Sequence, residues 1–425
     1  MTETAYSTGW PGTGERPFHE GSAVYIPGRQ DTHDERVPPD EVCLSLHSLE
    51  LANLGVRRAL VHEQIETILD APDRRGHPYC MWLAILTLLY TGDLVAAYTA
   101  CRQLATDPRW SGSQRHQELL TLMRARISLL SGDGVKTSAL LSEALAHGLA
   151  APLHRLAVAW LVEAHVLAGG TDTAHKVLLA HELAGRLDPG LPDVAYVLAA
   201  RGTLRMATGQ VQDALDDLIS CGRILTAQNV ANPAVIPWRS RAAFAALAAR
   251  RQDLALALAS DELTAARSWG APRGIGIALH AVAVAGRGED AVTSLEEAVE
   301  LLGLAHARGE LIHALHDLAR LQTERGDPSA ARTRLEAAFA VARESRNGLW
   351  PEQLKSALER HDLPVLTSQE LRISELARAG YSNRQIAETL FLAVRTVEFH
   401  LSSVYRKLGV SGRRELRSAL GAPPS

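Results

Sequence analysis

Turn signals return at a nearly constant interval through the middle of this 425-residue chain. Six glycines each follow an apolar helical run, and a polar segment at residues 250–253 stands where one further turn is expected. The successive spacings are 40, 37, 40, about 41, about 36 and 40 residues. Such a period is typical of a repeated helix–turn–helix unit, because one unit is too thin to bury its own apolar face. The glycines are Gly92, Gly132, Gly169, Gly209, Gly286 and Gly326.

Small residues that follow the turns support antiparallel helix pairs. Five of the seven turns have alanine five residues after the glycine, where a short side chain lets the second helix lie close to the first. The pattern therefore predicts about seven stacked helical hairpins of tetratricopeptide type, with a continuous core and a curved surface. These alanines are Ala97, Ala174, Ala214, Ala291 and Ala331.

The predicted fold is all-α and has three parts. Residues 1–40 contain five prolines and five glycines without an apolar period, so we expect them to be disordered. Residues 41–361 form the repeat array, which opens with a hairpin over 41–71 and closes with a helix over 350–361. Residues 362–425 form a separate module of four short helices.

Tryptophans occur about once per repeat. They can serve the core and the packing between repeats, or they can line a groove for a ligand or peptide on the concave face. The sequence leaves both interpretations open. The residues are Trp82, Trp110, Trp160, Trp238, Trp269 and Trp350.

The net charge of −4 hides an asymmetry along the chain. From His361 onward nine Lys and Arg face six Asp and Glu, which gives +3, so the first 360 residues carry −7. A mildly basic end on an acidic body favours a nucleic-acid-binding module joined to a part that does not bind DNA.

Other patterns narrow the function classes. The longest apolar stretch, about residues 80–90, is too short to cross a membrane, and the polar N-terminus shows no secretory signal. Four scattered cysteines without a CxxC pair indicate reduced thiols, so we expect a cytoplasmic protein. No phosphate loop, GxSxG or HExxH occurs, and His313 with His316 lacks a third ligand at metal spacing. We therefore expect neither an enzyme nor a metal site nor a cofactor.

The C-terminal module shows its own start and stop signals. Thr367 with Glu370 three residues later predicts a capping box for a first helix that Gly380 ends. Ser382 is expected to cap a second helix, whose first turn holds Asn383 and Arg384. Backbone N–H groups, the helix dipole and the guanidinium can together bind a phosphate there.

The third helix is predicted over residues 394–408. Val397, Leu401, Val404 and Leu408 form a buried stripe. The opposite face is expected to carry Arg395, Thr396, Glu398, Phe399, Ser402 and Ser403, with Arg406 and Lys407 near the end. A helix of this make-up suits the DNA major groove. Ser411 is expected to cap a fourth helix, in which Leu416 and Leu420 are available for packing or for a dimer contact.

These residues resemble the LuxR-type (GerE-like) helix-turn-helix domain of bacterial regulators. The resemblance rests on LTSQEL, GYSNRQIAETLFL, RTVEFHLSSVYRKLGV and SGRREL, and it covers about 55 residues. Upstream, WGAPRGIGIALHA resembles the C-terminal half of the large ATP-binding LuxR regulators, although their ATPase domain is not expected in this chain. The resemblance implies base contacts at Glu398, Phe399 and Ser402. It implies phosphate contacts at Asn383, Arg384, Arg395, Thr396 and Lys407, and a dimer contact at Leu416 and Leu420.

Two positions depart from the family pattern. Ala393 stands where a Ser or Thr usually caps the recognition helix, which costs about 1 kcal/mol of helix stability. Glu398 stands where some relatives have a basic residue. Its carboxylate can accept from a cytosine amino group but repels phosphate, so we expect specific binding to depend strongly on sequence and nonspecific binding to be weak.

Two functions remain open. The first is a sequence-specific transcriptional regulator, an activator by resemblance, that binds double-stranded DNA as a homodimer and then contacts RNA polymerase. A small-molecule or protein effector would act on its array. The second is a protein-interaction scaffold whose array binds a partner and for which DNA binding is secondary. Only residues 361–365 separate the closing helix from the module, so the array is expected to set how two modules face each other.

Overall fold

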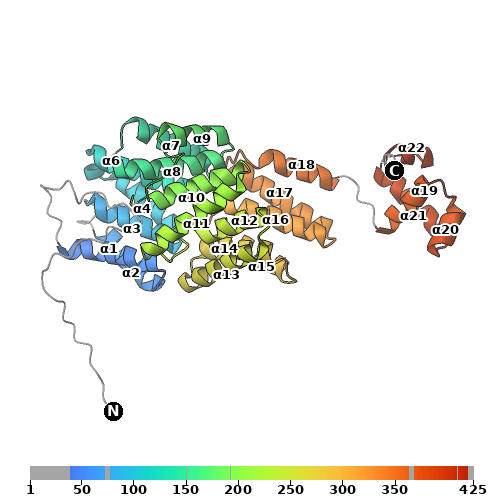
Figure 1. The fold of residues 1–425 in the computed structure, drawn as a ribbon, viewed down its shortest axis with the longest axis horizontal. Coiled ribbons are helices and arrows are strands. Elements are labelled where there is room, and N and C mark those ends of the chain that lie inside the picture. The colour runs from blue at the N-terminus through green and yellow to red at the C-terminus, as the bar shows by residue number, and fades with distance from the viewer. Residues whose placement is uncertain are drawn as a thin grey trace, which may run out of the picture. The chain divides into compact units, whose positions relative to one another are not determined.

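A computed structural model describes residues 39–71, 77–149, 151–191, 193–362, 368–408 and 410–419 (Figure 1). The residues it describes form helices and no strand, which confirms the all-α prediction. Most of the predicted disordered segment lies outside them, although the first helix already begins at Pro39. Among these residues, no helix is both long enough and apolar enough to cross a bilayer.

Helices of the array follow one another as antiparallel pairs. The opening pair is α1 (Pro39–Leu54) and α2 (Arg58–Asp70). The seven predicted hairpins follow as α3 (Pro78–Thr91) with α4 (Leu94–Thr106), α6 (Gln114–Leu130) with α7 (Gly134–Ala146), α8 (Ala151–Leu167) with α9 (Thr171–Ala180), α10 (Val194–Ala207) with α11 (Val211–Ala227), α12 (Trp238–Ala248) with α13 (Gln252–Trp269), α14 (Pro272–Gly286) with α15 (Ala291–Leu304), and α16 (Arg308–Glu324) with α17 (Pro328–Glu344). A short α5 (Pro108–Ser111) and the closing α18 (Pro351–Asp362) complete this part.

The turns form for the predicted reason. Five of the six glycines adopt φ between 77° and 89°, the left-handed conformation that ends a helix without a side-chain clash. The sixth differs by one residue, because Gly286 still belongs to α14 and Arg287 takes the left-handed position at φ 49°. Arg250, in the predicted gap, has φ 60°. All five alanines that follow the turns are buried.

Tryptophans serve the core. Trp82, Trp110, Trp160 and Trp269 are at most 2% exposed, and Trp350 is also buried. Their burial confirms the packing interpretation for these five, whereas Trp238 is partly buried, with the Arg239 guanidinium 4.6 Å from the centre of its ring. The cysteines Cys80, Cys101 and Cys221 are buried and are not joined by disulfides, and burial raises the pKa of Cys101 to about 12.

The chain divides into two compact units, one of residues up to Ala314 with Glu344–Leu349, the other of Leu315–Arg343 with Trp350 onward. This division runs through the last hairpin, so the predicted boundaries at residues 40 and 361 remain predictions.

Within the first unit, segments about 179 residues apart in the chain touch one another. The Asn53 carbonyl accepts hydrogen bonds from the backbone of Ala231 and Asn232, at 2.9 and 3.0 Å. The Trp269 indole donates to the Tyr90 carbonyl at 2.6 Å, across a separation of 179 residues. Within this unit the repeats therefore wind into a superhelix, in which segments about 179 residues apart lie on successive turns that pack against each other.

Glycines allow the closest of these approaches. A Cβ added at Gly132 would lie 2.8 Å from the backbone nitrogen of Gly309, and one at Gly348 would lie 2.1 Å from the carbonyl oxygen of Ala168. Real Cβ atoms do not approach backbone atoms this closely. Glycine at these positions is therefore required by contacts between superhelical turns.

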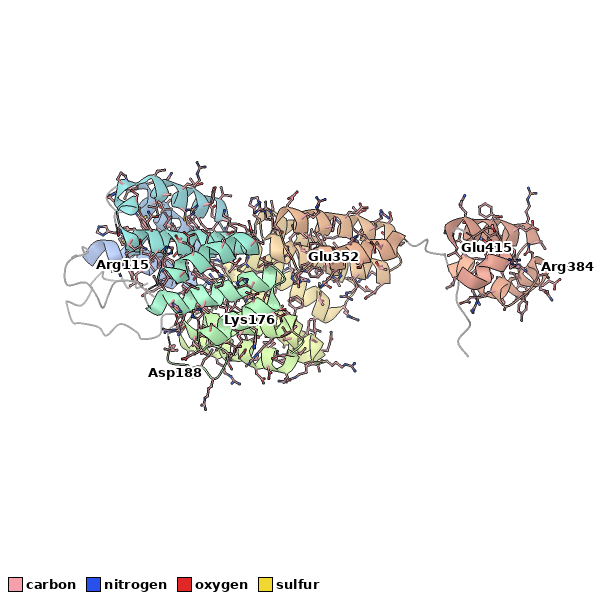
Figure 2. All side chains as sticks on the ribbon, turned by 90° about the horizontal axis from the view of Figure 1, so that it is seen from above. Arg115, Lys176, Asp188, Glu352, Arg384 and Glu415 are labelled. Carbon is pink, nitrogen blue, oxygen red and sulfur yellow. The ribbon has the colours of Figure 1, made fainter. Side chains whose placement is uncertain are left out.

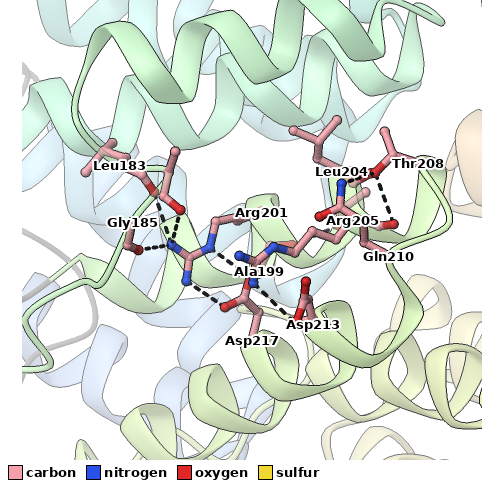
Figure 3. A network of polar contacts seen from close by, with 12 residues as sticks. Leu183, Gly185, Ala199, Arg201, Leu204, Arg205, Thr208, Gln210, Asp213 and Asp217 are labelled. Atoms are coloured by element: carbon pink, nitrogen blue, oxygen red, sulfur yellow. Dashed lines mark hydrogen bonds and ion pairs between the residues drawn. The ribbon is translucent and has the colours of Figure 1, made fainter.

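A buried ion network joins α10 to α11 (Figure 3). Asp217, 5% exposed, accepts two hydrogen bonds from Arg201 at 2.7 and 2.8 Å and one from Arg205 at 2.6 Å. Arg201 also donates to the carbonyls of Leu183, Ala184 and Gly185, which precede α10. From the sequence alone, adjacent carboxylates on a helix, such as Asp216 and Asp217, are expected to form a solvated face. That expectation holds for Asp216 and is wrong for Asp217, whose partners lie on another helix.

Glu262 gives the array a predicted pH dependence. Its carboxylate is 0% exposed, accepts from the Ser240 backbone N–H at 3.3 Å at the start of α12, and lies 3.7 Å from Arg239. Burial, only partly opposed by Arg239, raises the pKa of Glu262 to about 7. A pKa raised on folding means that the folded state holds the proton more tightly. The contribution of the protonated Glu262 carboxyl to the stability of the folded array is thus complete below about pH 4.5 and is lost as pH rises through about 7.

We expect Glu262→Gln, a neutral isostere, to unfold at a higher urea concentration than the unchanged chain at about pH 8, with the difference shrinking toward pH 5. Urea titrations at both pH values measure it. Glu297→Gln, which removes an exposed carboxylate from α15, is the control and should show no such trend. A pH-independent difference for Glu262→Gln would contradict the expectation.

Candidate nucleic-acid interface

The last four described helices enclose a small core of their own. They are α19 (Ser368–Arg378), α20 (Asn383–Leu390), α21 (Val394–Leu408) and α22 (Arg413–Ala419). The predicted stripe on α21 is confirmed, since Val397, Leu401 and Val404 are at most 3% exposed and Leu408 is partly buried. The other buried members are Ile373, Ala377, Ile386, Ala387 and Leu416.

The second helix begins as predicted. The Ser382 hydroxyl accepts from the Gln385 backbone N–H at 3.3 Å, and the Gln385 side chain accepts from the Ser382 backbone at 2.8 Å. This reciprocal pair is a full capping box. Gly380 ends α19 at φ 98°, also as predicted. Thr367 lies outside the described residues, so the first capping box stays a prediction.

Helix α21 starts without a side-chain cap at its first turn. The carbonyl of Ala393 accepts from the backbone of Thr396 and Val397 at 2.9 and 3.2 Å, but its methyl group cannot bind an N–H. Phe391, in the left-handed conformation at φ 54° and 95% exposed, forms the turn before it. The start of α21 therefore depends on packing within the module.

A buried carboxylate fastens α21 to α19. Glu370, 4% exposed, accepts from the Ser403 hydroxyl at 2.7 Å and from the Lys407 ammonium at 2.6 Å. The sequence pattern gave Glu370 only a capping role, and its partners 33 and 37 residues away were missed. The Lys407 ammonium thus already binds Glu370. Its phosphate contact remains a prediction, and it requires the ammonium to bind Glu370 and a phosphate at the same time.

We expect Glu370→Ala to loosen α21, because two donors lose a charged acceptor. The cost should be about 2 kcal/mol, or roughly thirtyfold faster amide exchange in peptides that cover α21. Hydrogen-exchange mass spectrometry measures this rate. Glu375→Ala, on the exposed side of the same helix, is the matched control. Equal exchange in both variants would show that the Glu370 contacts do not hold the helix.

A second contact holds the start of α20. Arg413 donates to the Asn383 side-chain oxygen at 2.7 Å and also to the Tyr381 carbonyl. Asn383 therefore offers only its amide N–H groups to a phosphate.

The fourth helix begins at Arg413 rather than directly after a Ser411 cap, and Glu415 accepts from the Ser411 backbone N–H at 2.7 Å. That hydrogen bond lowers the pKa of Glu415.

The predicted base-facing residues share the exposed face of α21. Glu398 and Ser402 are exposed, and Phe399 is 72% exposed, so no core contact holds the phenyl ring. Arg395 is exposed on the same helix, and Thr396 is partly buried. This face, Arg395, Glu398, Phe399 and Ser402, is called the reading face below.

Arg384 extends from α20, where Figure 2 shows it at the edge of the module. Its side chain is 85% exposed and its single ion pair, with Glu388 at 3.3 Å, is also exposed. An exposed pair of this kind is weak, so the guanidinium is available to a phosphate. Among the described residues, no group of three or more candidate metal ligands is found.

The two predicted dimer residues have different outcomes. Leu416 is 0% exposed and fills the core of its own module, so its side chain is not on a surface that a partner could reach. Of the two roles left open for it, packing is the one observed. Leu420 lies outside the described residues.

Comparisons with known proteins agree with this geometry. The family model for bacterial regulatory proteins of the luxR family matches residues 364–419. The oxygen regulatory protein NreC of Staphylococcus aureus is 44% identical over 52 residues, which span 12% of this chain and 24% of that relative. The chain thus covers about a quarter of the length of the curated relatives it matches.

Solved structures resemble the array in fold alone. The APC/C hetero-tetramer Cut9–Hcn1 aligns with a TM-score of 0.53 at 13% identity, over 90% of this chain and 72% of that chain. A Rap protein complexed with competence and sporulation factor aligns with a TM-score of 0.44 at 11% identity, over 80% and 98%. The tetratricopeptide-like repeat fold is confirmed. Residues 364–419 of this chain belong to the luxR family of bacterial regulatory proteins.

Proposed function

We propose that this chain is a sequence-specific DNA-binding transcriptional regulator without catalytic activity. The carrying observation is the reading face of α21, whose side chains are free of the module core while the opposite stripe is buried. Such a helix can place four side chains against base edges in the major groove. Arg384, at the start of α20, supplies a phosphate contact beside it.

The chemistry of the reading face favours selectivity over general affinity. Phe399 can contact a thymine methyl group, Ser402 can bind either kind of base edge, and Glu398 can accept from a cytosine amino group. The same carboxylate repels phosphate and weakens binding to arbitrary DNA. We therefore propose a homodimer on paired half-sites, which doubles the number of specific contacts. The resemblance to LuxR-type regulators is the basis for proposing activation through RNA polymerase.

A mobility-shift titration of the full chain on DNA from upstream of its own gene, across salt concentrations, tests the proposal. Retention of one fragment over competitor DNA near 150 mM salt supports a regulator. Loss of all sequence preference would instead favour the scaffold function, in which the array binds a partner protein.

Single substitutions test the roles of individual residues. Arg384→Ala should weaken binding to every sequence and reduce the salt slope by about 1, because one phosphate contact is lost. Phe399→Ala or Ser402→Ala should change which sites are preferred, by about 1–3 kcal/mol per contacted base. Arg372→Ala removes an exposed charge from α19 and serves as the control. If Arg384→Ala redirected the preference and the other two did not, the assignment would be wrong.

A further inference from the structure

Five charged side chains meet inside the superhelix, each from the first helix of a different hairpin. Three are guanidinium groups, of Arg126 on α6, Arg241 on α12 and Arg273 on α14. Two are carboxylates, of Glu163 on α8 and Glu310 on α16. Arg241 binds Glu163 and Arg273 binds Glu310 at close range, and Arg126 stands 3.7 Å from Glu163. This central cluster therefore holds one more positive charge than negative.

Arg126 carries the unbalanced charge. The residue is 7% exposed, and 3.7 Å to Glu163 is too long for a hydrogen bond. Its guanidinium lies over the Trp160 ring, 5.1 Å from the ring centre. Burial lowers the pKa of Arg126, an effect that Glu163 only partly opposes. A guanidinium carries five N–H donors, so a largely buried one whose carboxylate partner is 3.7 Å away can still donate to a bound anion.

Further donors surround the same place. The Nε atom of Arg273 is buried without an acceptor, and the Arg273 charge acts on Arg126. The hydroxyls of Tyr90 and Tyr196 lie 3.1 Å apart, and both act electrostatically on Arg126. Only one hydroxyl can donate to the other, so the second proton of the pair is left for another acceptor. Donors on Arg273 and on one of the two tyrosines are thus available close to Arg126.

We propose that the central cluster is a binding site for the carboxylate group of a small organic acid. A carboxylate accepts two parallel hydrogen bonds from one guanidinium and brings the single negative charge that the cluster lacks. A phosphate monoester, with about −1.5 to −2 charges at neutral pH, would leave an excess of negative charge. The site would give the proposed regulator a class of effector, small organic acids, that binds to the array. Only the regulatory role of the acid rests on the proposed function; the binding itself does not.

The side chains of the cluster are unequally exposed to solvent. The side chain of Arg241 is 28% exposed and that of Glu310 is 29% exposed, whereas that of Arg126 is 9% exposed. Arg126 is therefore the least exposed of these three side chains. Because α6 and α14 come from different superhelical turns, a bound carboxylate would join the two turns through Arg126 and Arg273.

Thermal unfolding of the full chain tests the site with acetate as the probe, against sodium chloride and sodium phosphate at equal ionic strength. Acetate should raise the Tm saturably, by about 2 °C when it exceeds its dissociation constant tenfold. Arg126→Met should abolish the acetate response. It should not lower the Tm in chloride, because it removes an uncompensated charge and keeps the volume. Arg102→Met, which removes an exposed guanidinium from α4, is the control and should respond as the unchanged chain does.

Arg126→Lys covers the case in which Arg126→Met does not fold. This variant keeps the positive charge but cannot form the bidentate hydrogen bonds of a guanidinium, so the rise in Tm caused by acetate should be several-fold smaller. Equal responses to acetate in the unchanged chain and in both variants would overturn the site. A response to phosphate alone that Arg126→Met removes would overturn the assignment to carboxylates. None of these readouts involves DNA, so failure of the site and failure of the proposed function are distinguishable.

Discussion

Replacing Asp217 with alanine is expected to lower the stability of the array by about 3–5 kcal/mol, because it leaves two arginines without their buried acceptor. Arg201 is 8% exposed and donates two hydrogen bonds to this one carboxylate. Without it, the guanidinium keeps only the carbonyls of Leu183, Ala184 and Gly185, which are neutral. Urea unfolding followed by circular dichroism measures the loss.

Asp216→Ala is the matched control for this prediction. Asp216 is the adjacent residue on α11, is exposed, and accepts only from Gln212 at 3.0 Å. Its substitution should change stability by less than about 0.5 kcal/mol. If Asp217→Ala were no more destabilising than Asp216→Ala, the network in Figure 3 would not support the array.

Gly348→Ala is the second large effect. The added Cβ would meet the Ala168 carbonyl oxygen at 2.1 Å, and a backbone atom cannot move aside as a flexible side chain can. Overpacking of this kind costs about 1–3 kcal/mol or more, and here it also separates two superhelical turns. Thermal unfolding gives the stability, and small-angle scattering should show a larger radius of gyration.

Gly303→Ala controls for the loss of glycine itself. Gly303 lies within α15 and an added Cβ meets nothing within 4 Å, so alanine should be neutral or stabilising there. A Gly348→Ala variant as stable and as compact as Gly303→Ala would contradict the stacked superhelix.

Local signals were sufficient to predict the hairpins. A left-handed turn favours glycine and a close helix pair favours a small residue, and five of the seven turns show both signals in the sequence, although Arg250 and Arg287 take the left-handed position at two of the turns. The tryptophans could be interpreted as core residues for a similar reason, since large apolar rings on a helical stripe fill a core.

Contacts over long distances in the chain could not be predicted. The superhelical turns meet through pairs such as Gly169 and Gly348, and no local pattern tells which repeats will touch. Asp217 shows the same limit, because whether a carboxylate on a helix is solvated or buried depends on a partner from another helix.

The candidate site also combines features that the sequence predicts with features that it does not. The reading face follows from the 3.6-residue period of α21, and its exposure agrees with the prediction. Lys407 and Asn383 looked free in the sequence, yet Glu370 and Arg413 hold them from 37 and 30 residues away. Leu416 looked available for a dimer and is instead required by the module core.

Selection of DNA from a random library by the full chain, with sequencing of the bound fraction, tests the central claim most directly. The reading face predicts an enriched motif of two related half-sites, with contacted positions that shift when Phe399 or Ser402 is replaced by alanine. A bound fraction without an enriched motif, or a motif unchanged in both variants, would contradict the claim that this chain reads DNA through α21.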